Sequence, residues 1–197
     1  ERMGVAPELV RRGYHFTEAR AVAADGRRIG SFRPSAFLGS SSRYVSIARS
    51  ELAAVLYDAL DGRVETVLGD TVEALDDDGE RVRVTLRSGN VRDVDLVVGA
   101  DGLHSQVRRL VFGAQERFER YLGIVVAALE IDGYRPRDEL VALMHAGIGY
   151  QVVRVSLEED TTLVLLTVRH PGAPVSGPEQ QQALLRERLA GAGWEIP

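Results

Sequence analysis

The 197-residue sequence contains no cysteine and no lysine. Without cysteine there are no disulfides, no thiolate nucleophile and no cysteine-based zinc site. Without lysine there is neither a Schiff-base lysine nor the phosphate-binding lysine of a Walker motif, and all 24 basic residues are arginines. The four histidines, His15, His104, His145 and His170, lack the spacing of a metal site. The sequence therefore predicts no metal centre.

A basic excess and long apolar runs are also absent. The formal net charge is -5, which argues against nucleic acid as a partner because few counterions would be displaced on binding. No apolar run approaches the ~20 residues of a membrane span, and the first residues lack a secretory apolar core. With 45% hydrophobic and 27% charged residues, the composition is that of an ordinary globular protein. We therefore expect a cytoplasmic protein.

The most informative stretch is residues 94–109, VDLVVGADGLHSQVRR. Its short apolar run, residues 94–98, is typical of a strand covered on both faces, as in a parallel sheet. The Asp101-Gly102 turn follows, and helical spacing begins near Ser105. Because ligands of open α/β sheets lie beyond the carboxyl ends of the strands, this stretch predicts a nucleotide-binding crossover.

Each polar residue of this turn has a chemical reason to be there. Gly102 can adopt positive φ and lets a ligand approach the backbone. Ser105 is a good N-cap for the helix, and Arg108 lies where its guanidinium is expected to reach back and orient the Asp101 carboxylate. The alternative is a plain strand, turn and helix with a cap and a surface ion pair.

A second candidate site lies at Arg49, at the start of a helix predicted over residues 50–60. A cation at a helix N-terminus opposes the macrodipole at a cost of roughly 0.3–1 kcal/mol. An anion bound there would offset this cost. The residues alone leave open whether Arg49 holds such an anion or pairs with Glu51 or another surface carboxylate.

The remaining elements follow from periodicity and turn residues. Hairpins are predicted over residues 17–33 and 71–86, the second with an acidic tip that lacks the glutamate of a calcium loop. Residues 64–68 are expected to form a buried strand, and residues 34–43 a serine-rich loop. After Gly113 the pattern predicts an antiparallel sheet and then an amphipathic helix, over residues 121–131, 140–145, 150–156, 162–169 and 179–190.

At two places the sequence resembles a known family. Asp101, Gly102, Ser105 and Arg108 spell D-G-x-x-S-x-x-R, which resembles the second fingerprint of the flavoprotein aromatic hydroxylases, FAD-dependent monooxygenases with the p-hydroxybenzoate hydroxylase fold. The I-A-R-S-E-L segment is similar to the R-x-x-L segment of that family, whose arginine contacts FAD. The resemblance implies that these four residues and Arg49 bind FAD, that NAD(P)H is the co-substrate, and that no side chain acts as a nucleophile.

The resemblance also implies an architecture. We expect an α/β (α+β mixed) fold, with a partial FAD-binding, Rossmann-like parallel sheet with helices and an antiparallel substrate-side sheet. The flavin domain would comprise residues 1–13 and 44–112, and the substrate side residues 14–43 and 113–197. Candidate substrate contacts are His145, Tyr150 and Arg154, although strand alternation alone favours a structural or surface role for each of them.

Two segments of the family pattern are missing from these 197 residues: the G-x-G-x-x-G that would come before residue 1, and the later Gly-Asp segment. We therefore expect the central part of a monooxygenase acting on an aromatic or polyketide-like molecule. The isolated chain should be inactive, bind FAD weakly, and pair with another chain through an exposed sheet edge. The alternatives are a same-fold flavin reductase or halogenase, and a non-catalytic fragment that binds a ligand or partner.

Overall fold

A computed structural model describes residues 3–34, 45–134, 140–157 and 161–196. The chain forms two compact units, one of residues 1–61 and 122–197 and the other of residues 62–121. Most of the predicted serine-rich loop lies outside the described residues. Within them, no helix is both long and apolar enough to cross a membrane.

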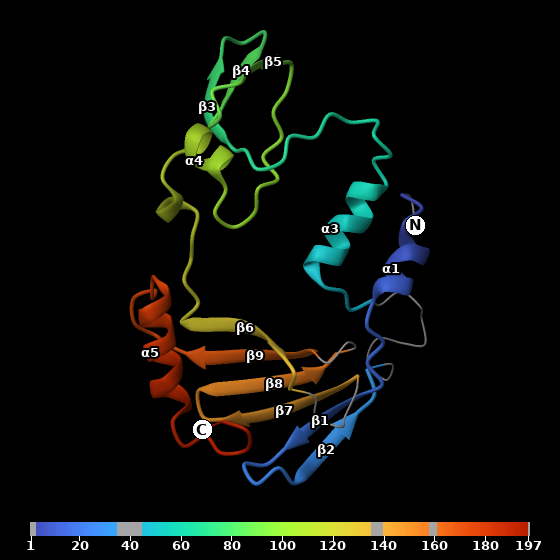
Figure 1. Ribbon diagram of the computed structural model, residues 1–197. Coiled ribbons are helices and arrows are strands. Elements are labelled where there is room, and N and C mark those ends of the chain that lie inside the picture. The colour runs from blue at the N-terminus through green and yellow to red at the C-terminus, as the bar shows by residue number, and fades with distance from the viewer. Residues whose placement is uncertain (1–2, 35–44, 135–139, 158–160, 197) are drawn as a thin grey trace. The chain divides into compact units, whose positions relative to one another are not determined.

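The first unit contains a six-stranded sheet in the order β2-β1-β7-β8-β9-β6 (Figure 1). Its β1 pairs in parallel with β7, and every other neighbouring pair is antiparallel. The hairpin of β1 and β2 is therefore joined to strands more than a hundred residues later, as the family resemblance implied. The strands are β1 (Glu18–Val22), β2 (Arg28–Phe32), β6 (Ile124–Asp132), β7 (Val141–Gly147), β8 (Tyr150–Ser156) and β9 (Thr161–Arg169).

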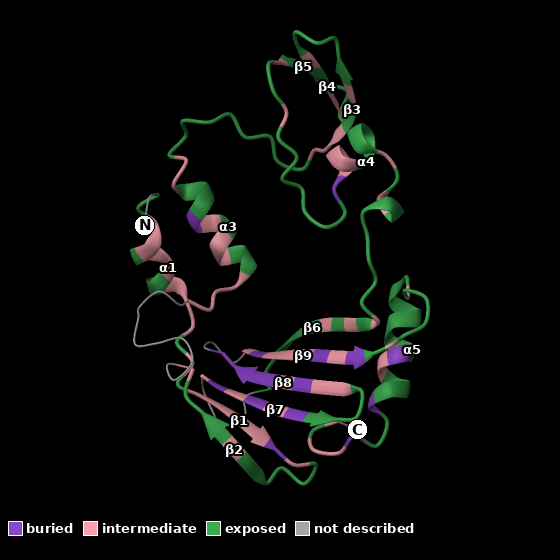
Figure 2. Cartoon of the chain, turned by 180° about the vertical axis from the view of Figure 1, so that it is seen from behind, coloured by how far each residue is buried: buried purple, intermediate pink, exposed green. Residues whose placement is uncertain are grey.

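Helix α5 (Pro178–Leu189) covers one face of this sheet. Its Leu184 and Leu189 are buried with Val152, Leu166 and Val168 of β8 and β9, which are among the buried segments of the sheet in Figure 2. The remaining positions of the helix are mostly charged or polar and exposed, so one stripe holds it to the sheet. The predicted C-terminal amphipathic helix is confirmed.

Two further helices belong to this unit, α1 (Ala6–Arg12) and α3 (Arg49–Asp58). Proline in the first turn of α1 suits a position whose N–H would have no helical partner. Helix α3 confirms the helix predicted at residues 50–60, with Val55 as its buried residue. The two helices pack against each other and are linked by ion pairs.

The second unit is built on a three-stranded antiparallel sheet of β3 (Val72–Asp77), β4 (Val82–Leu86) and β5 (Val91–Val94). Helix α4 (Gln106–Phe112) packs near β3, and a 3-10 turn, η1 (Gln115–Arg117), follows. The predicted hairpin is confirmed. At its tip, the Asp78 carboxylate accepts hydrogen bonds from the N–H groups of Glu80 and Arg81, at 2.9 and 2.7 Å, so it closes the turn.

Two predicted strands are wrong. Of the strand predicted at residues 94–98, only Val94 belongs to a strand, as the last residue of β5, and residues 95–98 join no sheet; residues 64–68 are not a strand either. Leu96 and Val98 keep 75% and 76% of their surface exposed. The reason is that an apolar strand needs a hydrogen-bonded neighbour and a cover on both faces, and the sheet of this unit ends at Val94.

The fold class as a whole is confirmed: a mixed α/β chain with a large mixed sheet and a separate antiparallel sheet. Parallel pairing among the described residues is confined to β1 and β7. The division into a flavin domain and a substrate side stays a prediction.

Candidate functional site

The Asp101 turn is organised around the N-terminus of helix α4. One oxygen of the Asp101 carboxylate accepts hydrogen bonds from the N–H groups of Gln106 and Val107, at 2.7 and 3.0 Å. The other accepts from the Ser105 hydroxyl. Ser105 in turn accepts from the Arg108 N–H at 3.0 Å and is the helix N-cap, as predicted. Three of the helix's free N–H groups are thereby satisfied.

This set of donors fixes the charge of the carboxylate. The Ser105 hydroxyl, and then the backbone N–H of Val107, lower the pKa of Asp101 from 3.8 to about 2. The group is therefore ionised at any physiological pH. Its chemistry is that of a fixed negative charge which orders a turn, and it is unsuited to general acid–base catalysis.

The predicted contact between Arg108 and the Asp101 carboxylate is wrong. Arg108 Nη2 donates instead to the carbonyl of Leu103 at 2.6 Å, and its guanidinium carbon lies 5.8 Å from the ring centre of Phe118. The reason is competition, because Asp101 already accepts from the serine and two backbone groups. Arg108 Nε is buried and, among the described residues, has no hydrogen-bond partner.

The turn borders a hollow of about 790 Å³ within the second unit. The hollow is largely apolar, and its lining includes Leu75, Val98, Gly102, Ser105, Arg108 and Phe118. Its volume lies in the usual range of small-molecule sites.

Two glycines shape the wall of this hollow. Gly102 adopts φ +82°, and nothing lies within 4 Å of the place where its Cβ would be, so a ligand can approach its backbone. Gly99 is different, because a Cβ there would lie 2.9 Å from the Cγ1 of Val107. Gly99 therefore permits the chain to pass close to helix α4.

Arg49 belongs to the other unit, where it is the first residue of α3. It is exposed, and among the described residues its guanidinium makes no ion pair or hydrogen bond. The N-cap residue, Ala48, provides no side-chain cap. Glu51, the alternative partner considered above, binds Arg12 instead, with Nη1 and Oε2 3.2 Å apart. The first turn of α3 thus presents a free cation beside uncapped N–H groups, a combination suited to an anion.

Of the predicted substrate residues, His145 and Tyr150 make their contacts within the fold. The buried His145 ring lies between the carbonyls of Val22 and Ala192, each 3.0 Å from one ring nitrogen. Tyr150 Oη lies 3.1 Å from Nε2 of the same ring and 3.3 Å from the Ala192 carbonyl. These contacts join β7, β8 and the segment after α5.

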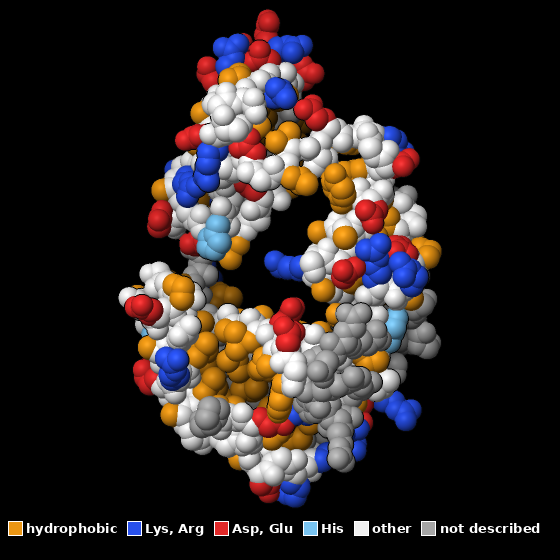
Figure 3. Space-filling model, viewed as in Figure 1, with side chains coloured by type: hydrophobic (Ala, Val, Ile, Leu, Met, Phe, Trp, Pro, Cys, Tyr) orange, Lys and Arg blue, Asp and Glu red, His pale blue; other side chains and the backbone are white. Residues whose placement is uncertain are grey.

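Arg154 is placed differently, on the wall of a second hollow of about 670 Å³ between the sheet and α5. Its side chain is 4% exposed, forms an ion pair with Glu195 and has its guanidinium carbon 5.5 Å from the Trp194 ring centre. Burial, and then Glu195, raise the pKa of Tyr134, which lines the same hollow. Figure 3 shows apolar side chains gathered over the strands beside α5, and those lining the hollow are Leu129, Ile131, Val152, Val164, Leu166, Leu185, Leu189 and Ile196.

Comparisons with known proteins agree on one family. A family model described as an FAD binding domain matches residues 1–189. An uncharacterized protein of Mycobacterium tuberculosis is 33% identical over 205 residues, covering 98% of this chain and 53% of that protein. A flavin-dependent monooxygenase of an unknown prokaryotic organism is 28% identical over 155 residues, covering 77% and 40%.

Among solved structures, the crystal structure of the tetracycline destructase Tet(51) matches with a TM-score of 0.79 and 24% identity, covering 98% of this chain and 50% of that one. At this level of identity the likeness concerns the fold. The chain spans about half the length of the curated relatives it matches.

Proposed function

Since this chain belongs to the family of FAD-binding domains, we propose that its parent protein is an FAD-dependent, NAD(P)H-consuming monooxygenase that hydroxylates an aromatic or polyketide-like small molecule. The observation that supports this best is Arg49. Its guanidinium is exposed and without a partner among the described residues, on a helix start that lacks a side-chain cap, and it matches the family's FAD-contacting arginine.

The residues present suit FAD at two places. At the start of α3, Arg49 and the uncapped N–H groups would hold an anionic group of the cofactor. In the second unit, the Arg108 side chain lines the hollow, and the open backbone of Gly102 is free to meet a ligand. The first N–H groups of α4 are not, because Asp101 and Ser105 already accept from them. Asp101 and Ser105 would thus act by shaping the turn.

When bound, FAD supplies the oxygen-transfer chemistry, and the protein binds, orients and shields it from water. The pKa of about 2 at Asp101 suits a fixed negative charge rather than a proton carrier. We propose that the substrate lies against the sheet of β6–β9, where the hollow beside α5 offers the buried Arg154, paired with Glu195, and a large apolar surface. His145 and Tyr150 stay predicted substrate residues that also have structural contacts.

The test uses the full-length parent protein. Purified protein should carry flavin absorbance, and it should consume NAD(P)H and oxygen faster when a phenolic or polyketide-like compound is added. Consumption of NAD(P)H without substrate-dependent oxygen uptake would favour a reductase, and a requirement for halide would favour a halogenase. A parent protein that stays colourless with added FAD would contradict the proposal and favour a non-catalytic binding role.

A further inference from the structure

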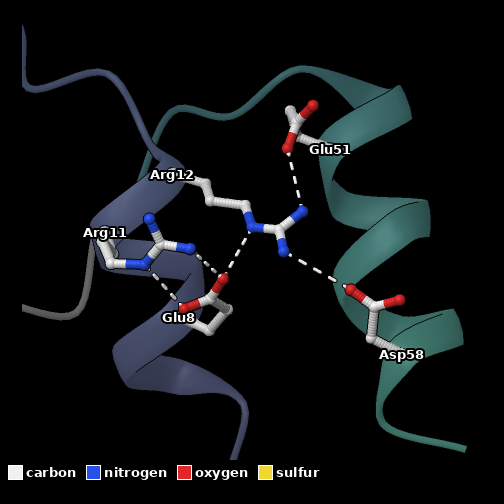
Figure 4. A network of polar contacts seen from close by, with 5 residues as sticks. All are labelled: Glu8, Arg11, Arg12, Glu51 and Asp58. Carbon is white, nitrogen blue, oxygen red and sulfur yellow. Dashed lines mark hydrogen bonds and ion pairs between the residues drawn. The ribbon is translucent and has the colours of Figure 1, made fainter.

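Arg12, at the end of α1, binds carboxylates at both ends of α3 (Figure 4). Its Nη1 lies 3.2 Å from Glu51 Oε2, and its Nη2 lies 3.4 Å from Asp58 Oδ2. Its Nε donates to Glu8 Oε1 at 2.7 Å, which orients the guanidinium from its own helix. The Arg12 side chain is 26% exposed, whereas its carboxylate partners Glu51 and Asp58 are 46% and 63% exposed, so the network lies at the surface with the guanidinium as its more sheltered member.

A second tie lies just before Arg49. The N–H of Tyr14 donates to the carbonyl of Ser46 at 2.6 Å. At Gly13, a Cβ would come within 2.3 Å of the Val45 Cγ1, so only glycine allows this approach. The segment after α1 is therefore hydrogen-bonded to the segment before α3, at a point three residues before Arg49. Together the two ties fix the first turn of α3 against α1.

The ion pair also decides where the Glu51 carboxylate lies. Counting from the N-cap Ala48, Glu51 is the third residue of the helix, the position from which a glutamate can reach back to the free N–H groups of the first turn. In that place it would compete with an anionic ligand and repel it. Arg12 holds the carboxylate and offsets part of its charge, which leaves Arg49 and the N–H groups for the ligand.

We propose that Arg12 is a positioning residue for the Arg49 flavin contact, because it anchors α3 and keeps the Glu51 carboxylate away from the anionic groups of FAD. This inference rests on the proposed function, in which Arg49 holds FAD. Arg12 itself does not touch the cofactor in this scheme. Its effect passes through Glu51 and through the placement of the helix.

The experiment measures the FAD dissociation constant of the full-length apoprotein by quenching of flavin fluorescence. R12Q should weaken FAD binding about fivefold, the scale of one charge at a helix N-terminus. The matched control is R11Q, since Arg11 is the neighbouring arginine and, within the described part of the chain, pairs only with Glu8 of its own helix. R11Q should change the constant less than twofold.

Rescue separates positioning from a merely structural role. In the double variant R12Q/E51Q the unbalanced carboxylate is gone, so FAD binding should return to within about twofold of the wild type. Raised salt should shrink the R12Q defect for the same reason. If R12Q folds poorly, R12K serves in its place: it keeps the charge and should bind FAD within about twofold of the wild type, and a larger loss would contradict the charge-based role.

The failures of this inference and of the proposed function are distinguishable. If R49Q weakens FAD binding but R12Q does not, or if E51Q fails to rescue R12Q, Arg12 is not a positioning residue and the proposed function stands. If R49Q itself leaves FAD binding unchanged, the proposed role of Arg49 fails and this inference fails with it.

Discussion

The carboxylate of Asp101 accepts a hydrogen bond from the N–H of Val107 at 3.0 Å, six residues along the chain, and so caps helix α4. Asp101, the first residue of the D-G-x-x-S-x-x-R motif, therefore also stabilises the N-terminus of the helix. Because the capping group is a carboxylate, the stability of the second unit should depend on pH in a predictable direction.

Stability should fall in acid because the native carboxylate of Asp101 holds its proton less tightly than an unfolded one. Its pKa is about 2 in the folded chain against an ordinary value of 3.8. A lowered folded pKa contributes stability that is present above 3.8 and is lost as the pH falls toward 2. We expect D101N to be less stable than the wild type at pH 7, and the difference to shrink between pH 4 and pH 2. Denaturant unfolding at a series of pH values measures it. If the difference in unfolding free energy between D101N and the wild type does not change with pH, the Asp101 carboxylate does not cap the helix.

Ser105→Ala should remove the second cap of α4. Ser105 is buried and accepts from the Arg108 N–H. Loss of an N-cap hydroxyl costs about 1 kcal/mol. Urea denaturation measures the free energy of unfolding, and S50A on the exposed first turn of α3 is the control, expected within about 0.5 kcal/mol of the wild type. Equal effects of the two changes would show that the Ser105 hydroxyl does not cap the helix.

Arg154→Ala should destabilise the first unit by about 2 kcal/mol. Breaking a fully buried ion pair costs about 3–5 kcal/mol, but the Glu195 partner is 36% exposed and regains some solvation. R186A, on the exposed side of α5 beside the same hollow, is the matched control and should be nearly neutral. Chemical denaturation of both variants provides the measurement. A neutral R154A would mean that the pair contributes little to the fold.

Gly13→Ala should disturb the junction of α1 and α3. The added methyl group meets the Val45 side chain at 2.3 Å and the Leu9 carbonyl oxygen at 2.9 Å, and such overpacking typically costs about 1–3 kcal/mol. In G30A the new methyl group has nothing within 4 Å, so this change should be neutral or stabilise by up to about 1 kcal/mol. The difference between their melting temperatures tests the close approach. Equal melting temperatures for G13A and G30A would contradict the close approach at Gly13.

The isolated 197-residue chain should self-associate through residues 94–98. Leu96 and Val98 are exposed there, directly after the last strand of the small sheet. Unpaired apolar chain beside a sheet invites strand pairing. L96K should lower the association measured by analytical ultracentrifugation, whereas I148K, at a turn that is even more exposed, should not. If both variants associate like the wild type, the segment around Leu96 does not mediate the self-association.

Some features of this protein were determined by its sequence alone. The hairpin of β1 and β2, the strands β6 to β9 and helix α5 follow from alternation, turn glycines and helical spacing, which are local signals. The Ser105 cap follows in the same way, because a serine before a helical pattern finds its partner three residues away. The family motif also depends only on local spacing.

Other features were decided only by the tertiary structure. Arg108 binds the Leu103 carbonyl and not Asp101, because nearer donors had already occupied the carboxylate. Arg12 forms an ion pair with Glu51, which lies 39 residues later in the chain. Residues 94–98 are apolar enough for a strand, yet only Val94 pairs with a neighbouring strand, and residues 95–98 join no sheet. The physical reason is common to all three: folding decides which groups from distant parts of the chain come together, and no local pattern records that outcome.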